Sequence, residues 1–212
     1  MNKRNTSKSQ AEALRVSLHF ATCIGAARPA LPSGVNDDIV AAALSFASDD
    51  EAGARWSAEN GYPGYTSYGS GIDICAAAPC FRVLKKSLDK EAAAFAEQCG
   101  LDLGAGALKL DNIWLNVLRR DGFHSGHIHP HSVISGTYYA QVPKNASAIR
   151  FEDPRLPMMM AAPPRREGFE AFHYVQPEAG VALFWESWLR HEVVRNTSKA
   201  PRISVSFNYG WA

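Results

Sequence analysis

The sequence predicts a mainly β fold with flanking helices, and two observations carry this prediction. Strand-like runs follow one another through the second half of the 212-residue chain; each is short, rich in β-branched and aromatic residues, and bounded by Gly, Pro, Asn or Asp. Two segments of the first half show helical patterns instead. Antiparallel strands in this number indicate a jelly roll or a barrel as the core.

Length and composition suit a single domain, 1–212, in which residues 1–106 support a core formed by residues 107–212. The formal net charge is +1, so neither nucleic acid nor a membrane is expected as a partner. No apolar run reaches transmembrane length, and Arg15 and His19 interrupt the N-terminal stretch that mimics a signal peptide. We therefore expect a cytoplasmic protein, and the oligomeric state is open, a homodimer included.

The first half of the chain reads as alternating elements and loops. Residues 15–24 alternate loosely between apolar and polar and predict a strand, followed by a Pro- and Gly-rich loop over 25–34. Acidic and Asn residues at 36–38 predict the start of a helix that runs to about Ala47. Residues 48–80 are loop-like. Residues 81–99 carry apolar side chains at helical spacing and predict a helix on the outside of a sheet.

The second half predicts eight strands joined by turns and one long loop at 152–170. The loop is rich in Pro and contains a run of three methionines, whereas an upstream loop at 59–72 combines turn formers with three tyrosines. We expect these two loops to determine the substrate, although neither carries a recognisable substrate code. The predicted strands are Ile113–Leu118, Gly126–His129, Val133–Val142, Ala148–Phe151, Ala171–Val175, Val181–Trp185, Glu192–Val194 and Ile203–Tyr209.

A short stretch of the second half holds three histidines at spacing two: His127, His129 and His131. Residues i and i+2 of a strand point to the same face, so two of these imidazoles can aim at one point. Neutral imidazole suits iron, zinc, copper and nickel, which predicts a metal site here. Pro130 favours His127 with His129 as the ligand pair, and His129 with His131 is the alternative. In the first case His131 would contact a ligand or the substrate.

A distant segment can complete such a site. His191 follows a turn signal, and Arg202 and Ser204 share one face of the last predicted strand. Three ligands occupying one face of an octahedral ion leave the opposite face for a chelating cosubstrate and dioxygen. A keto acid bound there needs its far carboxylate held, for which arginine offers a planar pair of donors and serine a further hydrogen bond.

Three motifs occur in this order: H-x-H-P-x-S-x-I-S-G-x-Y-Y at 127–139, P-x-x-G-x-x-x-F-x-x-x-x-L-x-H at 177–191, and R-I-S-x-S-F-N at 202–208. With them, the sequence resembles the iron(II)/2-oxoglutarate-dependent oxygenases of the bacterial and phage H-x-H-P type. The resemblance covers about residues 112–211, and residues 64–67 fit it too. It implies a double-stranded β-helix core, a cupin-like jelly roll, with iron in its mouth.

By this resemblance His127, His129 and His191 would bind Fe(II), and Arg202 with Ser204 would hold the distal carboxylate of 2-oxoglutarate. The implied activity is that of a dioxygenase of the hydroxylase type, which oxidises a C–H bond of a small-molecule or peptide substrate with dioxygen and releases succinate and CO2. One position departs from the wider superfamily, in which most members carry Asp or Glu where this chain has His129. Three neutral imidazoles leave more of the metal charge to be balanced by the dianionic cosubstrate.

Three further residues are candidates for the same mouth. Tyr138 and Tyr139 point to opposite faces of their strand, and the interior one, assigned to Tyr138, would donate to the cosubstrate. Asn116 and Trp114 share a strand face and would line the site or contact the substrate, although packing explains them equally well.

Other functions fit parts of this pattern. A cupin-like three-histidine metalloenzyme, either a dioxygenase or an isomerase without 2-oxoglutarate, shares the H-x-H pair but has no use for Arg202 and Ser204. A metal-dependent hydrolase is disfavoured because Pro130 and Ser132 break its H-x-H-x-D-H pattern. A non-catalytic ligand-binding jelly roll is the alternative that is not an enzyme. The substrate itself is not encoded in any motif.

Overall fold

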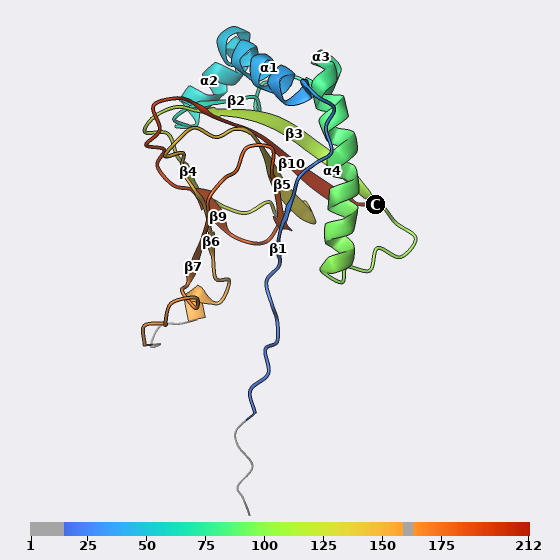
Figure 1. The fold of residues 1–212 in the computed structure, drawn as a ribbon, viewed down its shortest axis with the longest axis vertical. Helices are drawn as coiled ribbons and strands as arrows, with labels where there is room; N and C mark the ends of the chain where they lie inside the picture. Colours follow the sequence, from blue (N-terminus) through green and yellow to red (C-terminus); the bar gives the residue numbers. More distant parts are fainter. Residues whose placement is uncertain (1–14, 159–162) are drawn as a thin grey trace, which may run out of the picture.

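The computed structural model describes residues 15–158 and 163–212, and their largest element is a six-stranded antiparallel sheet. Its strands lie in the order β1-β8-β5-β10-β3-β2 (Figure 1). The longest pairing joins β3 and β10 over almost their whole lengths. The strands are β1 (Ile24–Ala27), β2 (Tyr65–Thr66), β3 (Leu108–Leu118), β5 (Ile134–Gln141), β8 (Ala182–Glu186) and β10 (Arg202–Trp211).

A second sheet of four strands has the order β4-β9-β6-β7. From β3 onward, successive strands pass between the two sheets except at β6 and β7, which pair as neighbours. This alternation winds the chain into a double-stranded β-helix, the core that the sequence predicts. The strands of the second sheet are β4 (His124–His127), β6 (Ile149–Glu152), β7 (Phe172–Val175) and β9 (His191–Val193), and a 3-10 turn (Leu156–Met158) lies between β6 and β7.

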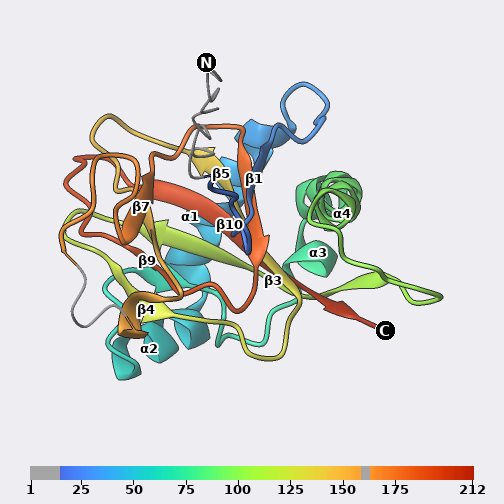
Figure 2. The same cartoon turned by 90° about the horizontal axis from the view of Figure 1, so that it is seen from below.

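Helices cover the outer face of the six-stranded sheet. They are α1 (Val35–Asp49), α2 (Glu51–Glu59), α3 (Ile74–Ala77) and α4 (Pro79–Gln98). Figure 2 shows α3 and α4 on one side of the molecule and β4, β7 and β9 on the other. Helix α4 buries an apolar stripe that includes Phe81, Leu84 and Leu88, as its helical spacing predicts. Gly100 follows it at φ 73°, a left-handed conformation that glycine adopts without strain.

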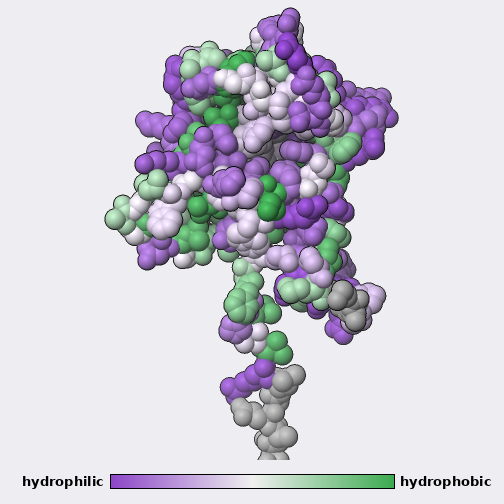
Figure 3. Space-filling model, turned by 180° about the vertical axis from the view of Figure 1, so that it is seen from behind, coloured by the Kyte–Doolittle hydropathy of each residue, from purple (hydrophilic) through white to green (hydrophobic). Residues whose placement is uncertain are grey.

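Side chains along β5 and β10 alternate between the two faces of the six-stranded sheet, so each face lines its own part of the interior. Ile203, Val205 and Phe207 of β10 join the apolar core beneath the helices. Their neighbours Arg202 and Ser204 point to the opposite face, toward the second sheet, where side chains of both sheets line the cavities described below. The six-stranded sheet thus has one face for packing and one polar face for chemistry. On the face drawn in Figure 3, hydrophobic residues are dispersed among hydrophilic ones.

The predicted strands of the second half are all present, with shifted ends. Strand β3 begins at Leu108 instead of Ile113, because its extra residues pair with the end of β10. Strand β4 spans His124–His127 instead of Gly126–His129, so it starts and ends two residues earlier than predicted.

Two predictions for the first half are wrong. Residues 15–23 form no strand, because only Ile24–Ala27 find partners in β8. Residues 48–80 contain α2, β2 and α3 and are not simply a loop. Helix α2 was obscured by Gly53, which lowers helix propensity. A glycine is required there, since a Cβ would lie 2.4 Å from Asp50 Oδ2 and 2.9 Å from the Thr66 carbonyl oxygen.

Within the described residues, no helix combines the length and the apolar character needed to cross a bilayer.

Candidate metal centre

Three histidines meet at the open end of the double-stranded β-helix. His127 is the last residue of β4 and lies opposite His191, the first residue of β9, in the register of the two strands. His129 follows β4 and is outside the strand, so the expectation that His127 and His129 share a strand face is wrong. Its backbone N–H donates to the Ser187 carbonyl oxygen at 3.0 Å, which turns the chain back toward the site.

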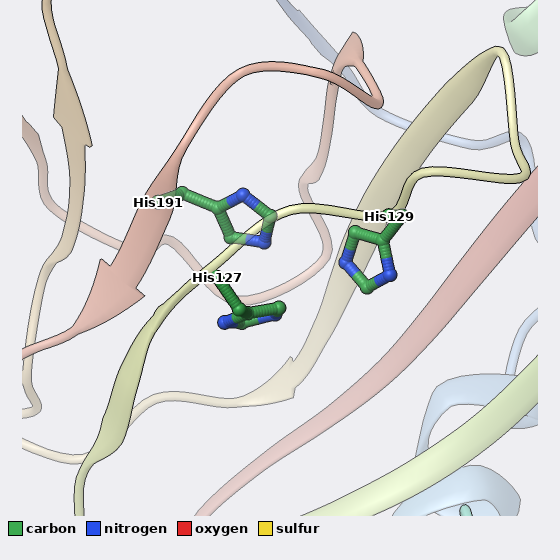
Figure 4. A group of neighbouring side chains, drawn as sticks. All are labelled: His127, His129 and His191. Atoms are coloured by element: carbon green, nitrogen blue, oxygen red, sulfur yellow. The ribbon is translucent and has the colours of Figure 1, made fainter.

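The three imidazoles point toward one another (Figure 4). One nitrogen from each lies within 4.8 Å of those of the other two, close enough to hold a single metal ion. The ring centroids of His127 and His191 are 4.4 Å apart, and those of His127 and His129 are 5.0 Å apart. The ligand set that the sequence predicts therefore comes together in space, although the strand argument used to predict it does not hold.

Hydrogen bonds at Nδ1 of His127 and His191 leave the Nε2 atoms of these two rings available to a metal. The Nδ1 atom of His127 lies 2.8 Å from the Ser125 carbonyl oxygen, and that of His191 lies 2.9 Å from the Leu189 carbonyl oxygen. A carbonyl only accepts, so we assign the proton to Nδ1 in both rings, which leaves the Nε2 lone pair free. The Nδ1 atom of His129 lies 3.3 Å from the side-chain amide of Asn208.

Burial keeps the imidazoles neutral, which metal binding requires. It lowers the pKa of His191 to about 2, assisted by the neighbouring His127. It lowers the pKa of His129 to about 4 and also lowers that of His127. All three rings are therefore available as ligands at neutral pH.

Arg202 lies beyond the histidines as a buried cation without an acidic partner. The residue is only 3% exposed, and its Nε has no hydrogen-bond partner. Its Nη1 lies 3.5 Å from the Ser204 hydroxyl, and its guanidinium lies 4.8 Å from the centre of the Tyr139 ring. Among the described residues, no carboxylate comes within 4.0 Å of it. Such a charge calls for an anion from outside the chain.

Two cavities meet at the histidines. The inner one, of about 40 Å³, is lined by Arg202, Ser204 and His191 among others. The outer one, of about 280 Å³, has exposed residues at its rim. Both are lined by His127 and His129 and by four further residues: Tyr62, Trp114, Asn116 and His124. A metal ion held by these histidines would thus be accessible from both cavities.

Of the other predicted site residues, some line the cavities and others point away from them. Trp114 and Asn116 line both cavities. His131 is exposed and lies outside the histidine cluster, so the alternative pair of His129 with His131 is not assembled. Tyr138 points away, toward the helices, where its hydroxyl donates to Asn36 Oδ1 at 2.7 Å. The tyrosine on the cavity side of β5 is Tyr139, because the strand register puts even-numbered residues on the helix side.

One residue of the site was missed from the sequence, and a second was noticed only as part of a tyrosine-rich loop. His124 lies before the predicted strand Gly126–His129, but it begins β4 and its ring stacks on His127 with the centroids 4.2 Å apart. Burial lowers the pKa of His124 to about 3. Tyr62 lines both cavities, and burial raises its pKa to about 12, partly offset by Arg202. The spacing of three between His124 and His127 hid the first of them, because a β-bulge breaks the register between these two residues.

The two candidate substrate loops have different positions. Tyr62 and Tyr68 from residues 59–72 line the outer cavity, whereas Tyr65 is turned to Asp50, to which its hydroxyl donates at 2.8 Å. The described residues of 152–170 line neither cavity. They border a separate surface hollow with the segment before β1. Met159 and Met160 lie outside the described residues.

Residues 112–208 match the family model described as "Putative 2OG-Fe(II) oxygenase". No curated protein matches the chain.

Solved structures of similar fold include the α-ketoglutarate-dependent epimerase SnoN from nogalamycin biosynthesis, at 16% identity and a TM-score of 0.60 over 89% of this chain and 78% of that one. A Pseudomonas putida prolyl-4-hydroxylase has 15% identity and a TM-score of 0.56, over 89% and 93% of the two chains. HygX from Streptomyces hygroscopicus, solved with nickel and 2-oxoglutarate, has 14% identity and a TM-score of 0.55, over 89% and 82%. At these identities the likeness concerns the fold.

Proposed function

Because residues 112–208 match the model of a 2OG-Fe(II) oxygenase family, we propose that this protein uses Fe(II), 2-oxoglutarate and dioxygen to hydroxylate a C–H bond of a small-molecule or peptide substrate. Structures of similar fold support the choice of ligands, since HygX holds nickel and 2-oxoglutarate and SnoN holds Fe3+ and α-ketoglutarate. Such an iron centre transfers one oxygen atom to the substrate and one to succinate, with loss of CO2.

The proposed metal ligands are His127, His129 and His191. Their nitrogens fit one ion, and their depressed pKa values keep them unprotonated. Three imidazoles on one side of an octahedral ion leave the remaining positions for a chelating keto acid and a gas molecule. Hydrogen bonds from Nδ1 of His127 and His191 to backbone carbonyls fix the orientation of these rings and raise their basicity.

The buried guanidinium of Arg202, which has no acidic partner among the described residues, is the observation that carries the proposal. A carboxylate in the inner cavity would take both the free Nε–H and a neighbouring N–H in a bidentate pair, with the Ser204 hydroxyl beside it. The inner cavity alone is too small for a five-carbon diacid, so the keto end would extend toward the histidines that line both cavities. This geometry distinguishes the proposal from a three-histidine enzyme without a keto-acid cosubstrate.

Tyr139 takes over the role that the sequence assigned to Tyr138. Its ring lies against the guanidinium of Arg202, and its buried hydroxyl has no hydrogen-bond partner within the described residues, so we assign it to supporting Arg202 beside the carboxylate site. Trp185 also lines the inner cavity, and its buried indole N–H has no acceptor within the described residues. These side chains orient the dicarboxylate and exclude water from around it. The division into a supporting part, 1–106, and a catalytic part, 107–212, a cytoplasmic location and the absence of nucleic acid as a partner are further proposals.

Calorimetric titration of 2-oxoglutarate into the anaerobic Fe(II)-loaded protein tests this function. We expect Arg202→Ala to weaken 2-oxoglutarate binding by about 100-fold, since loss of one partner from a buried charge pair costs about 2–5 kcal/mol. Metal affinity should change less than about threefold, because Arg202 is not among the ligands. Arg195→Ala, an exposed arginine outside both cavities, is the matched control. Equal affinity of wild type and Arg202→Ala for 2-oxoglutarate would refute the assignment.

The reaction type needs a separate readout. In air, a hydroxylase yields succinate together with a product that is heavier than its substrate by one oxygen atom. Mass spectrometry with ¹⁸O₂ detects this oxygen in the product. Succinate formed with an isomer of unchanged mass would instead assign the chain to the epimerase type, and succinate without any change in a panel of small molecules and peptides would indicate uncoupled turnover.

A further inference from the structure

The described residues that line the outer cavity include no Asp, Glu, Lys or Arg. Apart from the histidines at its floor, none of the described residues that line it carries a charge at neutral pH. Five aromatic rings contribute to its wall: Trp56, Tyr62, Tyr68, Trp114 and Phe123. Neutral hydrogen-bonding groups are supplied by four residues: Asn60, Thr66, Asn116 and Ser125. Cavities of this kind bind apolar ligands that a few polar groups orient.

Large apolar side chains at the rim of this cavity are partly exposed to solvent. Tyr68 is 54% exposed, Ile128 45% and Phe123 39%, and all three line this cavity. Large exposed apolar side chains that gather around one hollow mark a binding site more often than single ones scattered over a surface. The rim therefore offers apolar area that an occupant would cover.

The aromatic rings of Trp56, Tyr68 and Trp114, called the aromatic wall here, pack against one another. The ring of Trp56 contacts that of Tyr68 edge-on at 5.6 Å between centroids, and Tyr68 contacts Trp114 edge-on at 5.2 Å. Trp114 in turn lies 6.0 Å from His129. Gly69 makes room for this arrangement, because a Cβ at that position would lie 2.1 Å from the Trp56 ring. The rings thus form a continuous wall from the rim to a proposed metal ligand.

We propose that the outer cavity holds the substrate, and that this substrate is an uncharged small molecule bearing a flat ring system. The identification of the occupant as the substrate rests on the proposed oxygenase function. Rings pack on the aromatic wall, and hydroxyl or amide groups of the substrate bond to the neutral polar residues. A charged group would lose its hydration against this lining, and none of the described side chains in the lining is Asp, Glu, Lys or Arg and could pair with it. The volume of about 280 Å³ exceeds the roughly 150 Å³ of a cavity that binds benzene, which suits two fused rings.

Equilibrium dialysis of three probes of equal size tests the proposal: 1-naphthylmethanol, 1-naphthoate and 1-naphthylmethylammonium. The measurement is made on the full chain and on Arg202→Met. This substitution removes a competing site for the anion, since Arg202 is the only Arg or Lys among the described residues that line the inner cavity. In Arg202→Met we expect the neutral probe to bind at least about tenfold more tightly than either ion. Equal or tighter binding of an ion, or no binding of the neutral probe, would overturn the proposal.

Substitutions locate the bound probe. Trp56→Ala and Tyr68→Ala should each weaken binding of 1-naphthylmethanol by about five- to tenfold, whereas Trp56→Phe, which keeps a ring, should retain most of it. Trp188→Ala is the control, since Trp188 is 46% exposed and borders the separate hollow near the segment before β1. A loss with Trp188→Ala but not with Tyr68→Ala would place the ring elsewhere and refute the assignment. These titrations need neither metal nor 2-oxoglutarate, so their outcome is independent of the calorimetric test of function.

Discussion

Replacement of Arg202 by Met should stabilise the ligand-free protein while removing its response to 2-oxoglutarate. Burying an ion without a partner costs several kcal/mol even after the protein relaxes. Arg202 is 3% exposed and has no carboxylate within reach among the described residues. The Tyr139 ring at 4.8 Å returns about 2 kcal/mol, and the 3.5 Å contact with Ser204 adds little. Water in the inner cavity offsets part of the rest, which leaves a net cost of about 1–3 kcal/mol.

Met fills a similar volume without charge, so Arg202→Met should raise the free energy of unfolding by this amount in the absence of ligand. Urea titrations followed by circular dichroism measure it from the midpoint at constant slope. The order should reverse on saturation with Fe(II) and 2-oxoglutarate, because a ligand at about 100 times its Kd adds about 2.7 kcal/mol to a protein that binds it. The variant should gain only what the metal alone supplies.

Arg195→Met, at an exposed site, should change stability by less than about 0.5 kcal/mol and serves as the control. Destabilisation of the ligand-free protein by 1 kcal/mol or more in Arg202→Met would show that the guanidinium is already satisfied within the chain. The inference that Arg202 awaits an external carboxylate would then fail.

Three further outcomes are expected. Below pH 6.5 histidines of the unfolded chain become protonated, whereas buried His124 and His191 of the folded protein stay neutral down to pH values of about 3 and 2. The free energy of unfolding of the metal-free protein should therefore fall by up to about 1.4 kcal/mol per pH unit for each of them. A flat stability between pH 7 and 5 in urea titrations would contradict their burial. Asn208→Ala should weaken metal binding by about 10-fold in a chelator competition assay, since Asn208 contacts His129 Nδ1, and an unchanged affinity would remove this orienting role. In the same assay His191→Ala should lose more than about 100-fold and His131→Ala nothing, whereas a loss in His131→Ala would reinstate the alternative ligand pair.

The β core was predictable from the sequence because each of its strands carries its own signal. Alternation, β-branched residues and turn formers locate a strand before its partner is known. Strand ends depend on distant partners instead, which is why the first residues of β3 were missed: they pair with the last residues of β10, about a hundred positions away. Helix α2 was missed for a related reason, since Gly53 weakens the local helix signal and is required by the contact with Thr66.

The candidate site was predictable to the extent that its residues stand in motifs. His127, His129, His191 and Arg202 were all identified, and the structure gathers them around two joined cavities. The face to which a tyrosine points was not predictable, because it depends on a register that only β8 and β10 define for β5. The assignment of Tyr138 in place of Tyr139 follows from this single ambiguity.

The balance of charge in the site explains why the proposed metal, the dicarboxylate cosubstrate and Arg202 would occur together. None of the described residues that line either cavity is Asp or Glu. A divalent metal and Arg202 would therefore place about three positive charges in a buried space with no protein anion. A dicarboxylate spanning from Arg202 to the metal balances two of them at once. Metal and cosubstrate must then each strengthen the binding of the other, by equal free energies as linkage requires. By this proposal a three-histidine centre would be balanced in charge only with its cosubstrate bound, which would account for an arginine that has no acidic partner among the described residues.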